Sequence, residues 1–545
     1  MKKIYFAALA FAVSLPAAAQ DTYESARLLG SDLNGTARYV GMGGAMDALG
    51  ADISTIGTNP AGIGLFRHSM ASVSFGLQSQ QDAKEFDGLG KTNMSFDQAG
   101  FVYTMRVDRN KFVNFGFNYH KSRNFDQILS AANRMRDVSS NLLTLEKNNK
   151  GYYELDLDKN GNFVGYVPGG DDMALTYSQL DDLNANNLSD DEVYTDDNGR
   201  EQIWPVYNGM AADEFTFDRA HRGWISDFDF NLSGNVNDRF YWGLTVGIHD
   251  VNYKGYSEYS EGLRFLSGED GGIVSYGDQR EIKGTGIDVK AGIIFRPVEA
   301  SPFRIGMSVA TPTWYSLTSS NVTGIENQSA LGERYDLLSH QWYYTESGDI
   351  SNSYEFKYYT PWKFGISLGH TVGKNLALGA GFEYSDYSAS RNRINDGRYY
   401  DWYYDDYYDE SHTDQPMKAN TERSLSGVST FKVGAEFKPD PAVSVRLGYN
   451  YVTAGYKKDG VRDMTIQSNG VSYASTTDYT NWEGTHRITA GLGFKVGGMN
   501  IDLAYQYSGT NGKFYPFQPN ITGSVDATDV SNKRHQLLLT LGYTF

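Results

Sequence analysis

The sequence predicts an all-β fold: a 14-stranded antiparallel transmembrane β-barrel, with an N-terminal hatch inside the lumen and long extracellular loops. Three observations lead to this prediction. Apolar and polar residues alternate over stretches of about ten residues, the connections between them are alternately tight and long, and no later apolar run reaches the ~20 residues that a membrane-spanning helix needs. The alternative is a soluble β-sandwich, which has no reason to separate short and long connections so regularly.

Residues 1–19 have the pattern of a signal peptide. Lys2 and Lys3 give a positive start, residues 4–15 form an apolar run, and Ala17 to Ala19 fit a small-residue cleavage site. The run is too short to cross a bilayer as a helix, and the alternative is a buried N-terminal helix. We therefore expect the chain to be exported and cleaved near residue 19.

The composition narrows the class of protein. The 545 residues include no cysteine, which excludes a lipid-modified N-terminal cysteine, disulfides and thiolate metal sites. The chain has 40 Tyr, 29 Phe and 8 Trp, residues that favour strands and membrane interfaces. A net charge of −18 argues against nucleic acid as a partner, because phosphates require a basic surface.

The alternation is clear in residues 443–451, where Val443, Val445 and Leu447 share one face and Arg446 lies on the other. The last strand places Leu, Tyr and a terminal Phe545 on a single face. An even number of strands allows the first to pair with the last, which leaves no open edge. The fourteen predicted strands are 69–82, 97–107, 111–123, 223–236, 238–254, 281–296, 302–318, 354–372, 374–390, 425–438, 441–457, 483–496, 498–510 and 533–545.

The longest connection, at about 124–222, is predicted to be extracellular. Helical spacing of apolar residues predicts a helix over 126–145. Residues 156–161 match the first half of a calcium-binding loop, but Val167 stands where a bidentate acid is needed. We therefore predict a hairpin with an Asn-Gly turn there, and regard calcium binding as the alternative.

Residues 20–68, between the cleavage site and the barrel of 69–545, do not alternate. They are glycine-rich and moderately apolar, and their polar backbone cannot face lipid. The segment therefore either hangs in the periplasm or fills the barrel. Its apolar content favours filling, as a hatch or plug.

At these residues the sequence resembles the FadL/TodX family of outer-membrane channels for hydrophobic compounds, most closely its Bacteroidetes branch. The resemblance lies in the glycine-rich stretch 35–44, a short helical piece at 45–56, the triplet Asn59-Pro60-Ala61 before the first strand, and residues 360–365, Thr-Pro-Trp-Lys-Phe-Gly. It implies passive, porin-like lipid transport of compounds such as long-chain fatty acids through an apolar pocket. The hatch residues that it implies for gating are Gly41, Gly43, Gly44, Asn59, Pro60 and Ala61.

The resemblance also implies a sideways exit at a kink in the third strand. Gly116 is the candidate for this kink, and the alternative is a lumen glycine that makes room for the hatch. The lumen-facing cations Lys290, Arg304, Lys363 and Arg446 are candidates to hold a carboxylate head group. We favour the alternative that they pair with Asp227, Asp229, Glu383 or Glu436.

No nucleophile–base motif or phosphate loop is present, and the nine histidines are scattered. We expect no enzymatic activity, no cofactor and no metal. The expected partners are a hydrophobic small molecule, outer-membrane lipid and lipopolysaccharide, with the chain a monomer in the outer membrane of a Gram-negative bacterium. Two alternatives remain open: a general porin, and a barrel scaffold or secretion component that binds a protein partner.

Overall fold

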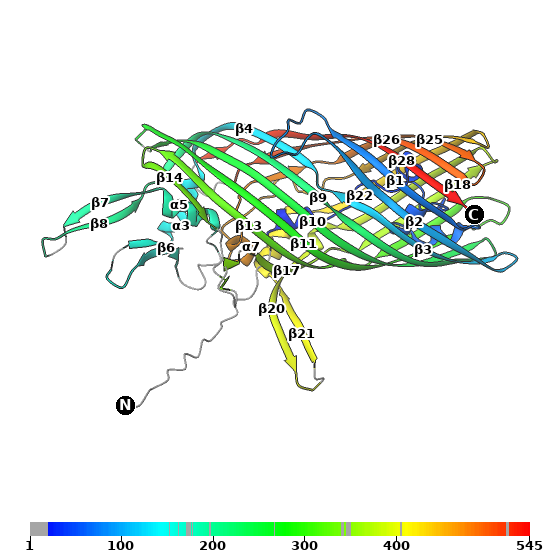
Figure 1. Ribbon diagram of the computed structural model, residues 1–545, viewed down its shortest axis with the longest axis horizontal. Coiled ribbons are helices and arrows are strands. Elements are labelled where there is room, and N and C mark those ends of the chain that lie inside the picture. Colours follow the sequence, from blue (N-terminus) through cyan, green and yellow to red (C-terminus); the bar gives the residue numbers. More distant parts are fainter. Residues whose placement is uncertain are drawn as a thin grey trace.

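The computed structural model describes residues 20–545 apart from 152, 162, 170–175, 177, 196–197, 266, 339–342, 345–349, 352, 404–405 and 519–522. The signal peptide expected at residues 1–19 lies outside the described residues. The chain forms a closed antiparallel barrel, which lies lengthwise in Figure 1. The ring closes where β1 pairs with β28, from Met70 opposite Thr544 to Gln80 opposite Arg534.

Fourteen strands make the wall, as the sequence predicts. Three of them consist of two consecutive pieces, which are joined by the word "with" in the next sentence. Around the ring they are β1 (Met70–Gln80), β2 (Thr92–Asp108), β3 (Lys111–Asn124), β9 (Met210–Val236), β10 (Phe240–Phe265), β11 (Asp270–Phe295), β12 (Arg304–Ala310) with β13 (Trp314–Ser329), β18 (Lys363–Val372) with β17 (Ser353–Tyr359), β19 (Leu376–Asp386), β22 (Gly427–Asp440), β23 (Val443–Val452), β25 (Thr485–Val496) with β24 (Tyr479–Trp482), β26 (Met499–Tyr515) and β28 (Thr528–Thr544).

The shorter elements lie in the lumen or at the extracellular end. They are α1 (Thr22–Ala26), α2 (Ala37–Gly41), η1 (Ile53–Gly57), η2 (Pro60–Leu65), β4 (Gln127–Val138), α3 (Ser140–Asn149), β5 (Tyr153–Leu157), β6 (Phe163–Pro168), α5 (Gln179–Asn187), β7 (Ser189–Thr195), β8 (Glu201–Tyr207), β14 (Gly332–Leu338), β15 (Tyr343–Tyr344), β16 (Ile350–Ser351), η3 (Tyr387–Ala389), β20 (Arg391–Asp401), β21 (Asp406–Thr413), α6 (Gln415–Ser424), α7 (Asn469–Ser472) and β27 (Ser524–Val525).

Two wall strands are interrupted by proline. Residues 311–313 separate β12 from β13, and residues 360–362 separate β17 from β18. Pro312 and Pro361 have no backbone N–H to give to a neighbour, so the ladder breaks there. The two breaks lie side by side, because Thr313 N donates to Thr360 Oγ1 at 2.7 Å.

The wall is apolar outside and polar inside. Leu447 is 64% exposed on the outer face of β23, whereas the neighbouring Arg446 is 4% exposed on the inner face. A soluble protein has the opposite distribution, and lipid is the solvent that favours this one. No helix in the described part of the chain is both long enough and apolar enough to cross a bilayer.

The two rims differ as the sequence predicts. Turns such as 237–239, 373–375 and 497–498 join strands tightly at one end. At the other end, β9, β10 and β11 run for 27, 26 and 26 residues, far beyond the ~10 residues that a tilted strand needs to cross a bilayer. Figure 1 shows hairpin β7–β8 beyond this end and hairpin β20–β21 projecting sideways.

The expected helix over 126–145 is wrong for most of its length, because residues 127–138 form β4, paired with β9. Only α3, at 140–149, is helical. The apolar side chains of β4 face the same cluster that a helix would have contacted, so the spacing alone did not separate the two structures. The hairpin predicted around residues 156–161 is confirmed as β5–β6.

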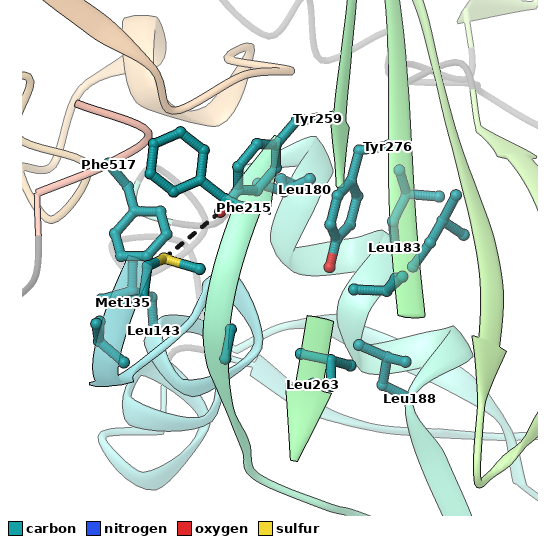
Figure 2. Close-up of a cluster of buried hydrophobic side chains, with 14 of the residues drawn as sticks. Met135, Leu143, Leu180, Leu183, Leu188, Phe215, Tyr259, Leu263, Tyr276 and Phe517 are labelled. Carbon is teal, nitrogen blue, oxygen red and sulfur yellow. Dashed lines mark hydrogen bonds between the residues drawn. The ribbon is translucent and has the colours of Figure 1, made fainter. Parts of the chain in front are cut away.

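A hydrophobic cluster fills the extracellular end of the barrel. Figure 2 shows Leu180, Leu183 and Leu188 of the α5 region packed against inward-facing side chains of β9, β10 and β11. Polar contacts fix the same helix, since Tyr276 Oη donates to Asn184 Oδ1 at 2.5 Å and Asn321 donates to Gln179 at 2.9 Å. The long loop thus folds into the barrel mouth.

Candidate functional site: the luminal segment, its cavities and a gap in the wall

Residues 20–68, here called the luminal segment, thread the inside of the barrel. Their elements contact β9, β10 and β11 on one side and β23, β25 and β26 on the other. Near the extracellular end Thr22 hydrogen-bonds Thr421 of α6 at 2.8 Å. At the turn-rich end Arg67, near the end of the segment, pairs with Asp238. The segment therefore runs nearly the whole length of the lumen.

Short helical turns in this segment are set by their N-caps. Thr36 accepts from Tyr39 N at 3.1 Å to begin α2, and Asn59 Oδ1 accepts from Ala61 N at 3.2 Å to begin η2. Pro60 occupies the first position of η2, where a missing N–H costs nothing. The Asn-Pro-Ala triplet is therefore a helix start, and it lies against Gly243 and Gly292 of the wall.

Glycines of the wall let the segment pack backbone against backbone. A Cβ on Gly434 would collide with Met42, and one on Gly448 would collide with Gly43. Gly43 and Gly44 adopt φ of +63° and +76°, which favour glycine. The Gly41 carbonyl accepts from Thr489 Oγ1 at 3.2 Å. These glycines bring the segment within hydrogen-bonding distance of the wall.

Three of the four cations predicted as candidate head-group contacts already bind other groups of the protein. Lys290 pairs with Asp229 at 2.9 Å, and Arg446 pairs with Glu436 at 2.7 Å and Asp502 at 2.6 Å. Arg304 donates to the Leu49 carbonyl of the luminal segment at 2.8 Å.

Glu436 also binds Arg38 of the luminal segment at 3.0 Å, so the same network that occupies Arg446 anchors the segment. The fourth cation, Lys363, lines a cavity and has no ion pair among the described residues.

Two adjoining cavities border the luminal segment, the larger on the side of Arg219 and Trp482 and the smaller on the side of His120 and Asp227. They have volumes of about 260 and 180 Å³ and share residues 29–34 of the segment as a common wall. The larger cavity has apolar and aromatic lining, with Leu29, Phe125, Val428 and Trp482 among it. It is also lined by Arg27, Arg123, Arg219, Arg487 and Arg534. The pocket is therefore amphipathic rather than uniformly apolar.

Asp32 of the luminal segment faces three of these arginines. It lies 3.8 Å from Arg487 Nη2, and its Oδ2 accepts from Asn124 N at 2.9 Å. Burial acts to raise the pKa of Asp32, but the positive charges of Arg123, Arg534 and Arg487 outweigh it, so the pKa lies below the usual 3.8. Asp32 is thus held among three guanidinium groups.

The wall has a gap beside this cluster. The pairing of β2 with β3 ends where Gln98 faces His120, although both strands continue. Above this point β2 pairs with β1 alone, and β3 pairs with β9 through a register shift at 121–123. Within the described chain, no strand pairs with residues 121–126 on the β2 side.

The luminal segment fills that gap. Asp32 N donates to the Ser122 carbonyl at 2.8 Å, and Asn34 Nδ2 donates to the Lys121 carbonyl at 3.0 Å. Asn34 Nδ2 also donates to Asp97 Oδ1 of β2 at 2.9 Å, so it bridges the two separated strands. Backbone groups that a neighbouring strand would satisfy are thus satisfied by residues 29–34.

Gly116 lies outside the irregular part of β3. It pairs in register with Val102 on one side and Asn231 on the other. A Cβ at this position would lie 3.5 Å from Ile56 and 3.6 Å from Ile63 of the luminal segment. The register shift in this strand is instead at 121–123, several residues further along.

The residues around the gap were not singled out by the sequence. Alternation places Arg487 and Arg534 on the lumen faces of their strands, but nothing local shows that they converge with Arg123. Asp32 and Asn34 lie in a segment without periodic pattern. Only the closed ring brings strands three, twelve and fourteen to one cavity.

Comparison with known proteins gives distant likenesses only. No family model matches the chain, and no curated protein matches it. Among solved structures, the Ralstonia pickettii toluene transporter TbuX is 13% identical, with a TM-score of 0.43 over 94% of this chain and 99% of its own. A Pseudomonas aeruginosa FadL homologue is 12% identical, with a TM-score of 0.47 over 97% and 99%. The Pseudomonas putida toluene transporter TodX is 8% identical, with a TM-score of 0.45 over 95% and 99%.

Proposed function

We propose that this chain is an outer-membrane channel of the FadL/TodX type, which takes up hydrophobic compounds with an acidic head group, such as long-chain fatty acids. Residues 29–34 act as its gate. One observation carries the proposal. This stretch forms a wall of the cavity and also fills the gap between β2 and β3.

The membrane location follows from the wall. Its outer face carries a band of exposed apolar side chains, and its inner face carries buried ion pairs. Closed barrels with an even number of antiparallel strands satisfy every backbone group without water, as lipid demands. Such barrels belong to the outer membrane of Gram-negative bacteria, where this one contacts lipid and lipopolysaccharide.

The route is sideways rather than axial. The luminal segment occupies the lumen, and the α5 cluster fills the extracellular mouth, which argues against a general porin for polar solutes. The gap between β2 and β3 borders the larger cavity, since Asp97, Arg123 and Phe125 line both. Moving residues 29–34 would connect the cavity with the lipid beside these strands.

The cavity chemistry selects an amphiphile. An aliphatic tail gains ~0.8 kcal/mol for each buried methylene against the apolar lining. An acidic head group is attracted by Arg123, Arg487 and Arg534, which now surround Asp32. A ligand carboxylate therefore competes with Asp32 for the same arginines. When the ligand displaces Asp32, residues 29–34 lose this electrostatic attraction and can move.

A reversible cross-link tests the gate. The chain has no cysteine, so Asn34→Cys with Asp97→Cys creates a single pair at side chains that already touch. In cells that lack another fatty-acid channel, we expect oxidation to reduce uptake of a labelled long-chain fatty acid to the level of cells without the barrel. Reduction should restore uptake.

The matched control is Lys254→Cys with Glu281→Cys, a cross-strand pair on β10 and β11 away from the gap. Oxidation of this pair should leave uptake unchanged, and mass spectrometry verifies both cross-links. Wild-type uptake with the 34–97 cross-link fully formed would show that residues 29–34 need not move.

A further inference from the structure

A ring of charged and polar side chains lies in the lumen below the gate. Asp227 and Asp229 on β9, Asp288 and Lys290 on β11, His120 on β3 and His249 on β10 alternate acid and base around it. His120 is the last residue of β3 that pairs with β2, so the ring stands at the base of the gap.

One oxygen of each β9 carboxylate is held and the other is free. Asp227 Oδ1 accepts from Ser122 Oγ and from His249 Nδ1, both at 2.7 Å, and Asp229 Oδ1 lies 2.9 Å from Lys290 Nζ. The second oxygens turn toward the His120 ring, where Asp227 Oδ2 lies 3.7 Å from Nε2 and Asp229 Oδ2 lies 3.6 Å from Nδ1. Asp229 is 0% exposed, and its Oδ2 has no hydrogen-bond partner among the described residues.

In the part of the chain that the structure describes, the His120 ring has no polar contact shorter than 3.4 Å. Its nearest polar neighbours are these two oxygens and Asn118 Nδ2, which lies 3.4 Å from Nδ1. One donor atom from each of His120, Asp227 and Asp229 lies within 4.8 Å of the others. Two ligands of a tetrahedral ion with bonds of ~2.1 Å stand about 3.4 Å apart, so these atoms would move together by up to about 1.4 Å around a bound ion.

Charge balance points the same way. Three carboxylates face the Lys290 ammonium group and His249, whose two ring nitrogens lie 2.7 and 3.2 Å from Asp227 and Asp288 and therefore both donate, as in an imidazolium. With His120 neutral the ring carries one uncompensated negative charge in a buried place. Such charges are not left unpaired in a protein interior. A bound cation supplies positive charge at this place, and so would protonation of His120.

We propose that His120, Asp227 and Asp229 bind one divalent first-row metal ion at the base of the gap between β2 and β3. An imidazole with two carboxylates suits Zn²⁺ or Mn²⁺ better than Ca²⁺ or Mg²⁺. Ser122, His249 and Lys290 orient the carboxylates from outside, as partners of metal ligands do. The ion ties β3 to β9 where β3 leaves β2.

The test uses the full barrel without a histidine tag. The protein is stripped with a chelator, loaded with ZnCl₂ or MnCl₂ at pH 7.5, gel-filtered and assayed for metal by mass spectrometry. We expect one ion per chain in the wild type and binding roughly a hundredfold weaker in Asp229→Asn and His120→Gln. Asp502→Asn, which removes another lumen carboxylate, should bind like the wild type.

Two readouts keep the proposal testable if a variant folds poorly. The first is the wild-type stoichiometry, and less than a tenth of an ion per chain would overturn the proposal in favour of a protonated His120. The second is electron paramagnetic resonance of the Mn²⁺-loaded wild type, which should show coupling to one imidazole nitrogen. A loaded barrel without this coupling, or an Asp229→Asn variant that binds normally, would also overturn it.

Discussion

Replacing Asp32 by asparagine should make the barrel bind an acidic amphiphile more tightly. The substitution keeps the shape of the side chain and the acceptor for Asn124 N, but removes the charge that competes with the ligand for Arg123, Arg487 and Arg534. An exposed ion pair contributes up to about 1 kcal/mol, and a hydrogen bond to a charged group about 1.5–3 kcal/mol.

Asp32 is half-buried and lies 3.8 Å from Arg487. We therefore expect removal of its charge to strengthen ligand binding by about 1.4 kcal/mol, between the values for an exposed ion pair and for a hydrogen bond to a charged group. This corresponds to a roughly tenfold lower Kd.

The assay is calorimetric titration of the purified barrel with dodecanoate and, separately, with dodecanol, which has the same tail and no charge. Asp32→Asn should tighten binding of the acid and leave binding of the alcohol unchanged. Glu483→Gln, which removes a carboxylate of the same cavity outside the arginine cluster, serves as the control. Equal effects on acid and alcohol, or no effect on the acid, would refute the assignment of these arginines to a head group.

Three further predictions follow from the packing and charge of the luminal segment. Deleting residues 31–58 should raise single-channel conductance in planar bilayers, and unchanged conductance would mean that these residues do not block the lumen. Gly434→Ala, whose Cβ collides with Met42, should destabilise the barrel by about 1–3 kcal/mol in urea unfolding, whereas Gly542→Ala, whose Cβ would make only ordinary van der Waals contacts, should not. Because the pKa of Asp32 is lowered, its contribution to stability is complete above pH 3.8 and is lost only as the pH falls through its lower folded value. The stability difference between wild type and Asp32→Asn should therefore stay constant from pH 8 to pH 5, and a decline over that range would contradict the shift.

The strands were predictable because alternation is a local property. Residues such as Arg446 and Leu447 reveal their faces from neighbours one position away, and each of the fourteen predicted strands has a counterpart in the ring. The extensions of β9, β10 and β11 were underestimated, since above the membrane their outer face meets water and the pattern weakens. The helix expected over 126–145 failed because a short apolar set fits either period.

The gate and the ring of His120 could not be predicted in this way. Their residues come from strands far apart in sequence, and convergence depends on closure of the barrel and on where β3 leaves β2. The fate of the predicted cations shows the same limit. Alternation placed Lys290 and Arg446 in the lumen, but their partners Asp229 and Glu436 could be identified only as alternatives.

The height at which β2 and β3 part has a consequence for the cargo. The paired stretch of β3 from Lys111 to His120 rises roughly 25 Å, at 3.3 Å per residue and a tilt of about 40°, which matches the thickness of the apolar band of such barrels. A molecule that leaves the barrel through this gap enters the outer leaflet and must still cross the inner leaflet. An ionised carboxylate crosses hydrocarbon poorly, so the acid must pick up a proton to descend. The last step is then diffusion of the protonated acid across the bilayer. Its rate should increase as the pH at the cell surface falls.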